Sequence, residues 1–380
     1  MVAYLDHAAS SPLAPGVREA MEPWLFENYA NPSALHTPGR KARQAIEESR
    51  ERIARVLGCA ADDVVFTSGG TEANNMVIRQ YARDQRHIII SCIEHDSVLR
   101  CARNAELEGC EVTYVPPNKD GIVDPEAIKK ALRTYTALVS VQAVNNELGT
   151  IQPIREIKQI IAESFAGEHA PCRLHVDAVQ AIGHIPVCLN ELGWDFLTLS
   201  AHKFGGPKGV GVLCCSSMPV DPLLHGGAQE RGFRSGTENV AGIVGMATAL
   251  EYAEVNRYAN EKRYSGLFDY FTTYLLRHFP DIRINGSTES RTFSNINILI
   301  PGVEAEASLL MLDLNGIYAS AGSACNASGN HPSHVLKAIG LTDEEARSSL
   351  RLTMGPETTW DQMQYTANKL VQIINSLRSV

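Results

Sequence analysis

Several features that would restrict the class of this 380-residue protein are missing from its sequence. No apolar run approaches the roughly 18 residues that a membrane-spanning helix needs, and the first residues lack the basic and apolar regions of a signal peptide. No cluster of basic residues stands out, and 43 acidic residues against 34 basic ones give a formal net charge of −9. That balance argues against direct binding of nucleic acid. Hydrophobic residues make up 44% of the chain, which is ordinary for a globular protein with a large core.

A disulfide framework is also absent. The nine cysteines are odd in number and include no C-x-x-C pair. A chain of this length buries enough apolar surface to fold without disulfides. We therefore expect reduced thiols and a cytoplasmic location.

The hydrophobic pattern alternates between short β-branched stretches and longer stretches with apolar residues at helical spacing. This alternation predicts an α/β fold with a largely parallel sheet between two layers of helices. A further strand at 209–215 follows the preceding one after a short Gly-Gly-Pro turn, so we expect it to be antiparallel. The other expected strands are 64–67, 87–92, 137–144, 174–178 and 196–200, and the helices between them are 71–83, 97–108, 125–133 and 153–164.

The pattern changes after a long helical stretch at residues 239–278, which contains no proline. Strand (292–300), helix (304–314) and strand (316–320) follow, which predicts a second, smaller α+β unit. No flexible linker separates the units, so we expect them to share an interface, where small-molecule sites often form. We assign residues 13–255 to the larger unit and residues 1–12 and 256–380 to the smaller one.

The most informative segment is 200–209, at the carboxyl end of an expected strand, where open α/β sheets bind their ligands. A lysine such as Lys203 can form a Schiff base in a partly desolvated cleft, while Ser200 and His202 can hold a phosphate. A solvated loop lysine is the simpler alternative.

Asp177 ends the neighbouring expected strand and is predicted to project to the same sheet edge as Lys203. A carboxylate there can pair with a pyridinium nitrogen and keep the ring protonated, which makes the ring an electron sink. Two alternatives remain open, a helix cap and a weak metal site that includes His175.

Two glycines and a hydroxyl residue connect a strand to a helix at 67–75. Gly70 and Thr71 would direct free backbone N–H groups, and the positive end of the helix, toward a phosphate. An ordinary capping arrangement is the alternative. Phosphate cradle, lysine and strand-end aspartate together fit a site for pyridoxal phosphate.

Two further residues can act on a substrate. Cys325 lies in a small, polar, glycine-containing stretch at 321–330, which favours an exposed thiol on a mobile loop, as a nucleophile requires, over a buried thiol. Arg351 alternates with apolar residues in a short strand. It is either a surface arginine or, if it borders the cleft, a bidentate ligand for an α-carboxylate.

Motifs along nearly the whole chain resemble those of the cysteine desulfurases of the NifS/IscS type, in the class V aminotransferase branch of pyridoxal-phosphate enzymes. They lie at residues 4–9, 31–33, 66–75, 94–95, 144–149, 175–180, 200–211, 225–239, 322–325 and 350–351. The resemblance implies the fold type I architecture of these enzymes. This is a large domain with a mostly parallel seven-stranded sheet and a smaller α+β C-terminal domain that carries the catalytic cysteine loop.

The resemblance also implies a role for each matching residue. Lys203 would bond the cofactor, His95 would stack on its ring and assist proton transfer, and Cys325 would be the nucleophile. A threonine from the second subunit completes the phosphate site in this family, so Thr237 implies a homodimer. The implied cofactor-binding residues are Gly70, Thr71, His95, Asn146, Asp177, Gln180, Ser200, His202, Lys203 and Thr237, and the implied substrate-binding residues are Asn31, Asn146 and Arg351. No metal ligand is implied.

The implied reaction converts L-cysteine to L-alanine and leaves the sulfur as a persulfide on Cys325. An acceptor or scaffold protein would then carry the sulfur to iron-sulfur cluster assembly, tRNA thiolation or DNA phosphorothioation. Two alternatives stay open: an aminotransferase or lyase of the same branch that uses Lys203 and Asp177 without a nucleophilic thiol, and a non-catalytic sulfur or iron-sulfur scaffold.

Overall fold

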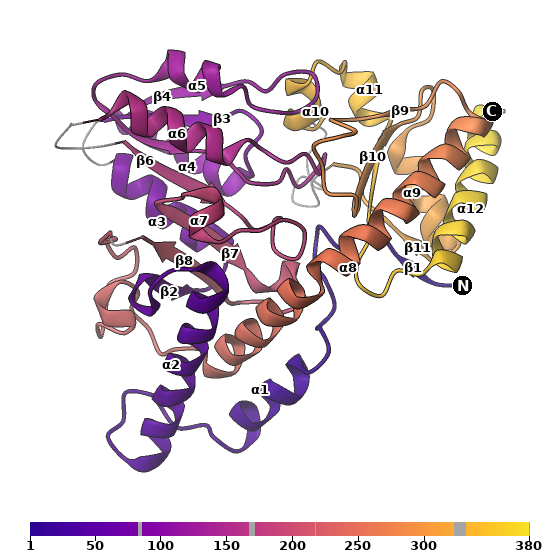
Figure 1. Ribbon diagram of the computed structural model, residues 1–380. Coiled ribbons are helices and arrows are strands. Elements are labelled where there is room, and N and C mark those ends of the chain that lie inside the picture. The colour runs from indigo at the N-terminus through magenta and orange to yellow at the C-terminus, as the bar shows by residue number, and fades with distance from the viewer. Residues whose placement is uncertain (83–85, 167–171, 217, 323–331, 380) are drawn as a thin grey trace.

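The computed structural model describes residues 1–82, 86–166, 172–216, 218–322 and 332–379 (Figure 1). A seven-stranded sheet with strand order β2-β8-β7-β6-β5-β3-β4 forms the centre of the larger unit. Only β8 runs against the other strands of this sheet, so the predicted mostly parallel sheet with one antiparallel strand is confirmed. The strands are β2 Val64–Thr67, β3 His87–Ser91, β4 Glu111–Val115, β5 Thr136–Ser140, β6 Arg173–Asp177, β7 Phe196–Ser200 and β8 Gly211–Cys215.

Helices cover both faces of this sheet, and every residue of the strands β2, β3, β5, β7 and β8 is buried between them, whereas the edge strand β4 is partly exposed. One face packs against α3 and α4, and the other against α2, α5, α6 and the first half of α8. The helices are α1 Val17–Phe26, α2 Thr37–Leu57, α3 Gly70–Ala82, α4 Asp96–Leu107, α5 Pro125–Ala131, α6 Ile154–Ser164, α7 Leu189–Leu192 and α8 Val240–His278.

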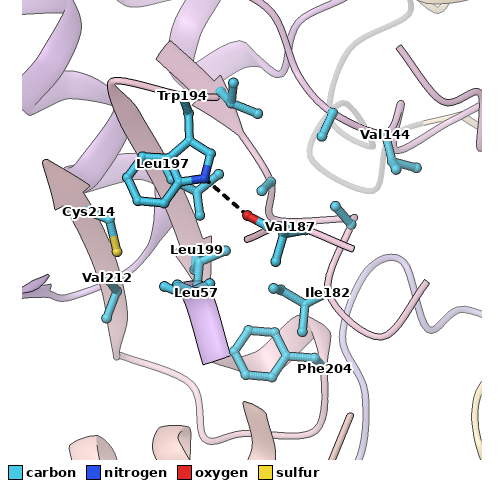
Figure 2. Close-up of a cluster of buried hydrophobic side chains, with 14 of the residues drawn as sticks. Leu57, Val144, Ile182, Val187, Trp194, Leu197, Leu199, Phe204, Val212 and Cys214 are labelled. Atoms are coloured by element: carbon cyan, nitrogen blue, oxygen red, sulfur yellow. Dashed lines mark hydrogen bonds between the residues drawn. The ribbon is translucent and has the colours of Figure 1, made fainter. Parts of the chain in front are cut away.

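The core on the second face includes Trp194, whose side chain is 1% exposed (Figure 2). Its indole Nε1 donates a hydrogen bond of 3.0 Å to the carbonyl oxygen of Val187. Leu197 and Leu199 of β7 belong to the same cluster. The indole therefore fills apolar space beside the sheet while its one polar atom is satisfied.

The smaller unit has its own hydrophobic core around a three-stranded antiparallel sheet, in the order β12-β10-β9. A two-stranded parallel sheet joins the chain start, β1, to β11. The elements are β1 Ala3–Tyr4, β9 Arg283–Ile284, β10 Asn295–Leu299, β11 Ile317–Tyr318 and β12 Ser349–Thr353, with helices α9 Ala305–Leu314 and α12 Trp360–Arg378. Two short helices of the C-terminal part, α10 His334–Ala338 and α11 Asp343–Arg347, instead pack against the core of the larger unit.

The 39-residue helix α8 belongs to both units, and Figure 1 shows it running from one to the other. Its first half, to Ala253, lies in the core of the larger unit, and residues from Tyr264 onward lie in the core of the smaller one. Tyr258, between the two halves, is 80% exposed. The proposed boundary at residues 255–256 falls in this exposed middle section, and the division into 13–255 and 1–12 with 256–380 stays a prediction.

Candidate active site

A cavity of about 220 Å³ lies at the carboxyl ends of the central strands, beside the start of the chain and β12. Parallel strands carry their loops to this edge, which is why residues far apart in the sequence meet here. Ten of the thirteen predicted site residues line the cavity: Gly70, Thr71, His95, Asn146, Asp177, Gln180, Ser200, His202, Lys203 and Arg351.

Asp177, the last residue of β6, is only 6% exposed, and both its carboxylate oxygens accept hydrogen bonds. Asn74 Nδ2 donates to Oδ2 at 2.8 Å, and the backbone N–H of Val179 donates to Oδ1 at 3.0 Å. The second bond closes a turn that no helix follows, so the helix-cap alternative is wrong. The carboxylate is held rigidly at the cavity wall.

Nothing favours the metal alternative at Asp177. His175 is fully buried, and its ring nitrogens contact Ser140 Oγ at 2.8 Å and Thr198 Oγ1 at 3.0 Å. Burial lowers the pKa of His175 to about 4, so the ring is neutral. Within the described ranges, no three His, Cys, Asp or Glu side chains come together as metal ligands would.

Lys203 follows β7 in a short 3-10 helix, Ala201–Lys203, and is half-buried rather than solvated. Its Nζ donates hydrogen bonds to the carbonyl oxygens of Ala8 at 2.6 Å and Ala9 at 2.9 Å. Gln180 Nε2 also donates to the Ala8 carbonyl, at 2.9 Å. The N-terminal segment thus forms one wall of the cavity and holds the lysine there.

His95 caps the N-terminus of α4 and faces the cavity. Its Nδ1 accepts a hydrogen bond of 3.1 Å from the backbone N–H of Ser97. Because Nδ1 is the acceptor, the neutral ring carries its proton on Nε2. Burial, together with the charges of Lys203 and Lys208, lowers the pKa of His202 to about 4, so the neutral ring can offer a hydrogen bond to a phosphate.

The phosphate cradle depends on close packing of glycines. A Cβ on Gly70 would lie 3.0 Å from Val179 Cγ2, and one on Gly211 would lie 2.6 Å from the Cα of Gly69. The turn before α3 can therefore lie directly against the start of β8. The N–H groups of the first helical turn, at Gly70 and Thr71, border the cavity, where they suit an anion.

Arg351 is not a surface residue, because it is 2% exposed. Its guanidinium pairs with Asp6 at 2.9 Å and donates to the carbonyl oxygen of Asn146 at 3.0 Å. Nε has no hydrogen-bond partner among the described residues. The surface alternative is therefore wrong, and the buried guanidinium lies where it can meet a carboxylate in the cavity.

Two of the predicted residues that the structure describes do not line this cavity. Asn31, between α1 and α2, and Thr237, before α8, are both exposed and do not line it. Cys325 lies outside the described residues. Sequence reasoning also missed one residue of the site, Asn74. Its side chain positions Asp177 and donates a hydrogen bond to Ser97 Oγ at 2.8 Å. The signal was its place one helical turn after Gly70, on the face of α3 that borders the cavity.

Comparisons with known proteins agree with this geometry. The family model described as Aminotransferase class-V matches residues 3–365. The chain is 46% identical to the cysteine desulfurase IscS of Dictyoglomus turgidum, with 99% of this chain and 95% of that protein covered. The chain belongs to the cysteine desulfurases of the class V aminotransferase family.

Solved structures support the same assignment. A structure described as a NifS-like protein has a TM-score of 0.92 and 34% identity, covering 99% of this chain and all of that one. A structure of SspA in complex with cysteine has a TM-score of 0.80 and 34% identity, covering 94% of this chain and all of that one. The predicted fold type I architecture is confirmed.

Cysteine desulfurases of this family depend on pyridoxal phosphate, and the residues at the cavity fit that cofactor. A carboxylate fixed by two donors suits the pyridine nitrogen, and the helix N-terminus at Gly70 suits the phosphate. Lys203 and the ring of His95 lie on the same cavity.

None of the helices in the described part of the chain is both long and apolar enough to span a membrane.

Proposed function

We propose that this protein converts L-cysteine to L-alanine and passes the sulfur, as a persulfide on Cys325, to an acceptor protein. The observation that carries the proposal is one cavity that combines Lys203, a fixed Asp177 and the buried guanidinium of Arg351. The first two suit pyridoxal phosphate, and the third suits the carboxylate of an amino acid. The likeness to SspA in complex with cysteine supports cysteine as that amino acid.

Nine of the residues that line the cavity have a proposed role toward the cofactor. Pyridoxal phosphate supplies an electron sink that stabilises negative charge at the α-carbon of a bound amino acid. Lys203 would bond it, Asp177 would hold its ring nitrogen and His95 would stack on the ring. Asn146 and Gln180 would lie on its phenolate side, and Gly70, Thr71, Ser200 and His202 would hold the phosphate.

Lys203 and His95 are the proposed proton-transfer groups. Lys203 Nζ donates hydrogen bonds to the carbonyl oxygens of Ala8 at 2.6 Å and Ala9 at 2.9 Å, which hold it at the cavity wall. Nε2 is the ring nitrogen of His95 that carries a proton, because Nδ1 accepts the hydrogen bond from Ser97. A lysine and a histidine on one cavity can therefore act as acid and base at the substrate carbon.

Arg351 would orient the substrate through its carboxylate, with Asn31 and Asn146 as the other proposed substrate ligands. The Cys325 thiolate would then attack the substrate sulfur. The new S–S bond forms as the C–S bond of cysteine breaks, and the electron pair stays with the carbon. That carbon takes up a proton and becomes the methyl group of alanine, while Cys325 holds the sulfur as a persulfide.

We propose that the enzyme is a cytoplasmic homodimer. Thr237 is exposed and lies off the cavity of its own chain, which supports a role at the cavity of a second copy. The eight described cysteines are free thiols, as a reducing compartment maintains them. The acceptor would be a protein that serves iron-sulfur cluster assembly, tRNA thiolation or DNA phosphorothioation.

The test is to incubate the purified enzyme with L-cysteine and a reductant and to measure alanine, sulfide and keto acid. We expect alanine and sulfide in equal amounts from the wild type, and neither from Cys325→Ala. The matched control is Cys188→Ala, which removes a half-buried thiol and is expected to retain activity. Keto acid as the product would indicate an aminotransferase, and activity in Cys325→Ala equal to the wild type would remove the persulfide from the proposal.

A further inference from the structure

The phosphate cradle contains a carboxylate of its own, Glu72, in the first turn of α3. Glu72 Oε2 accepts a hydrogen bond of 2.8 Å from the backbone N–H of Ser68, and so closes the turn that leads into the helix. The Glu72 side chain is only 9% exposed, so solvent screens its charge poorly. A helix N-terminus attracts anions. The Glu72 carboxylate, in the same helical turn as Gly70 and Thr71, would repel a phosphate bound there unless another group neutralised its charge.

Arg234 provides the neutralising charge. Its Nε donates to Glu72 Oε1 at 2.9 Å and its Nη2 donates to Oε2 at 3.4 Å. Burial alone would raise the pKa of Glu72, but the hydrogen bonds from Arg234 and Ser68 outweigh burial and lower this pKa. Glu72 is therefore ionised and paired at neutral pH, and the pair carries no net charge toward the cavity.

A separate network places the segment that carries Arg234. Four residues earlier, Glu230 is buried, pairs with Arg50 at 2.7 Å and accepts a hydrogen bond of 2.9 Å from the backbone N–H of Phe66 on β2. The next residue, Arg231, has a left-handed φ of +58°, which a residue other than glycine keeps only where its surroundings hold it. The segment is thus anchored to the strand that leads into the cradle, without help from Glu72.

We propose that Arg234 is a positioning residue for the cofactor phosphate: it cancels the charge of Glu72 and so leaves the N-terminus of α3 attractive to an anion. This inference rests on the proposed function, which places the phosphate at Gly70 and Thr71. The competing explanation is a purely structural ion pair that ties two segments together. Charge cancellation affects only the binding of a ligand that carries the phosphate, whereas loss of a structural ion pair would weaken the binding of any ligand in the cavity. A ligand without the phosphate therefore distinguishes the two explanations.

The test is a double-mutant cycle on the full chain stripped of cofactor, with the affinities for pyridoxal phosphate and for pyridoxal measured by fluorescence titration. We expect Arg234→Gln to weaken binding of pyridoxal phosphate at least ~10-fold but binding of pyridoxal less than ~2-fold. Glu72→Gln leaves the Arg234 charge uncancelled and should bind pyridoxal phosphate at least as tightly as the wild type, while its affinity for pyridoxal should change less than ~3-fold, because an amide still accepts the Ser68 hydrogen bond. In the double variant E72Q/R234Q most of the lost affinity should return, and Arg234→Lys, which keeps the charge, should stay within ~3-fold of the wild type.

Two results would overturn the inference while leaving the proposed function intact. One is an equal loss of affinity for both ligands in Arg234→Gln, and the other is no recovery in E72Q/R234Q. If Arg234→Gln fails to fold, the comparison of E72Q/R234Q with the wild type decides, because neither carries a net charge at this pair: affinities for pyridoxal phosphate within ~3-fold support charge cancellation, and a weaker double variant contradicts it. A wild type that binds pyridoxal phosphate no better than pyridoxal would instead contradict the phosphate site of the proposed function.

Discussion

Glu94 is a buried carboxyl group directly behind the wall of the active-site cavity, and we predict that it makes the stability of the protein depend on pH. It is 0% exposed. Its Oε1 accepts hydrogen bonds from Ser91 Oγ at 2.7 Å and from the backbone N–H of Gln142 at 2.8 Å, while Oε2 has no partner among the described residues. Burial, with a smaller contribution from the charge of Asp177, raises the pKa of Glu94 from 4.5 to about 8. At neutral pH the group is therefore protonated in the folded protein.

The size and sign of the effect follow from this difference in pKa. In the unfolded chain Glu94 ionises near pH 4.5, whereas in the folded protein it stays protonated until about pH 8. As the pH rises between these values the unfolded state gains stability from ionisation that the folded state cannot share. The Glu94 contribution to the free energy of unfolding is complete below pH 4.5 and falls by roughly 3 to 4 kcal/mol between pH 5 and pH 8.

Glu94→Gln removes the titration while nearly preserving shape. We expect the free energy of unfolding of the variant, minus that of the wild type, to rise by about 3 to 4 kcal/mol between pH 5 and pH 8. Urea denaturation at each pH, at one protein and one cofactor concentration, measures this difference. The control is Glu51→Gln on the exposed surface of α2, for which the difference should be flat. A Glu94→Gln difference that is also independent of pH would refute the buried, protonated carboxyl.

Three further predictions concern residues whose contacts are defined. Lys203→Ala should abolish covalent retention of the cofactor, measured as cofactor that stays with the unfolded chain after borohydride reduction. It should also lower the rate of desulfuration by roughly 10³-fold. Retention equal to that of the wild type would rule out Lys203 as the residue that bonds the cofactor. Arg351→Lys should raise KM for L-cysteine about tenfold with a smaller change in kcat, measured by steady-state kinetics, because an ammonium cannot replace the planar fork. Trp194→Phe removes the hydrogen bond to the Val187 carbonyl and should lower the free energy of unfolding by about 1 to 3 kcal/mol in urea denaturation. A Trp194→Phe variant as stable as the wild type would show that this carbonyl finds another partner.

Sequence reasoning predicted six of the seven strands of the central sheet and the helices α3 to α6, because their hydrophobic patterns are local, but it did not predict β4, α1 or α2. It also brought Asp177 and Lys203 to one sheet edge, since both end parallel strands that prove to be neighbours. It could not decide between a surface and a buried Arg351. The partner that accompanies this burial, Asp6, is 345 residues away in sequence. Asn74 escaped notice for the same reason, because its partner Asp177 is 103 residues away.

Most of the strands and helices, the family and ten of the residues that line the cavity follow from the sequence alone, since they rest on local periodicity and on motifs of a few residues. Tertiary structure decided which charges are buried and how each is paired: Arg351 with Asp6, Glu72 with Arg234, and Glu94 with no ionic partner among the residues that the structure describes. Protonation depends on burial and on neighbours brought together by folding, so no local pattern contains it. The sequence therefore indicated which groups are available for chemistry, and the packing of the two units determined the charge that each of them carries.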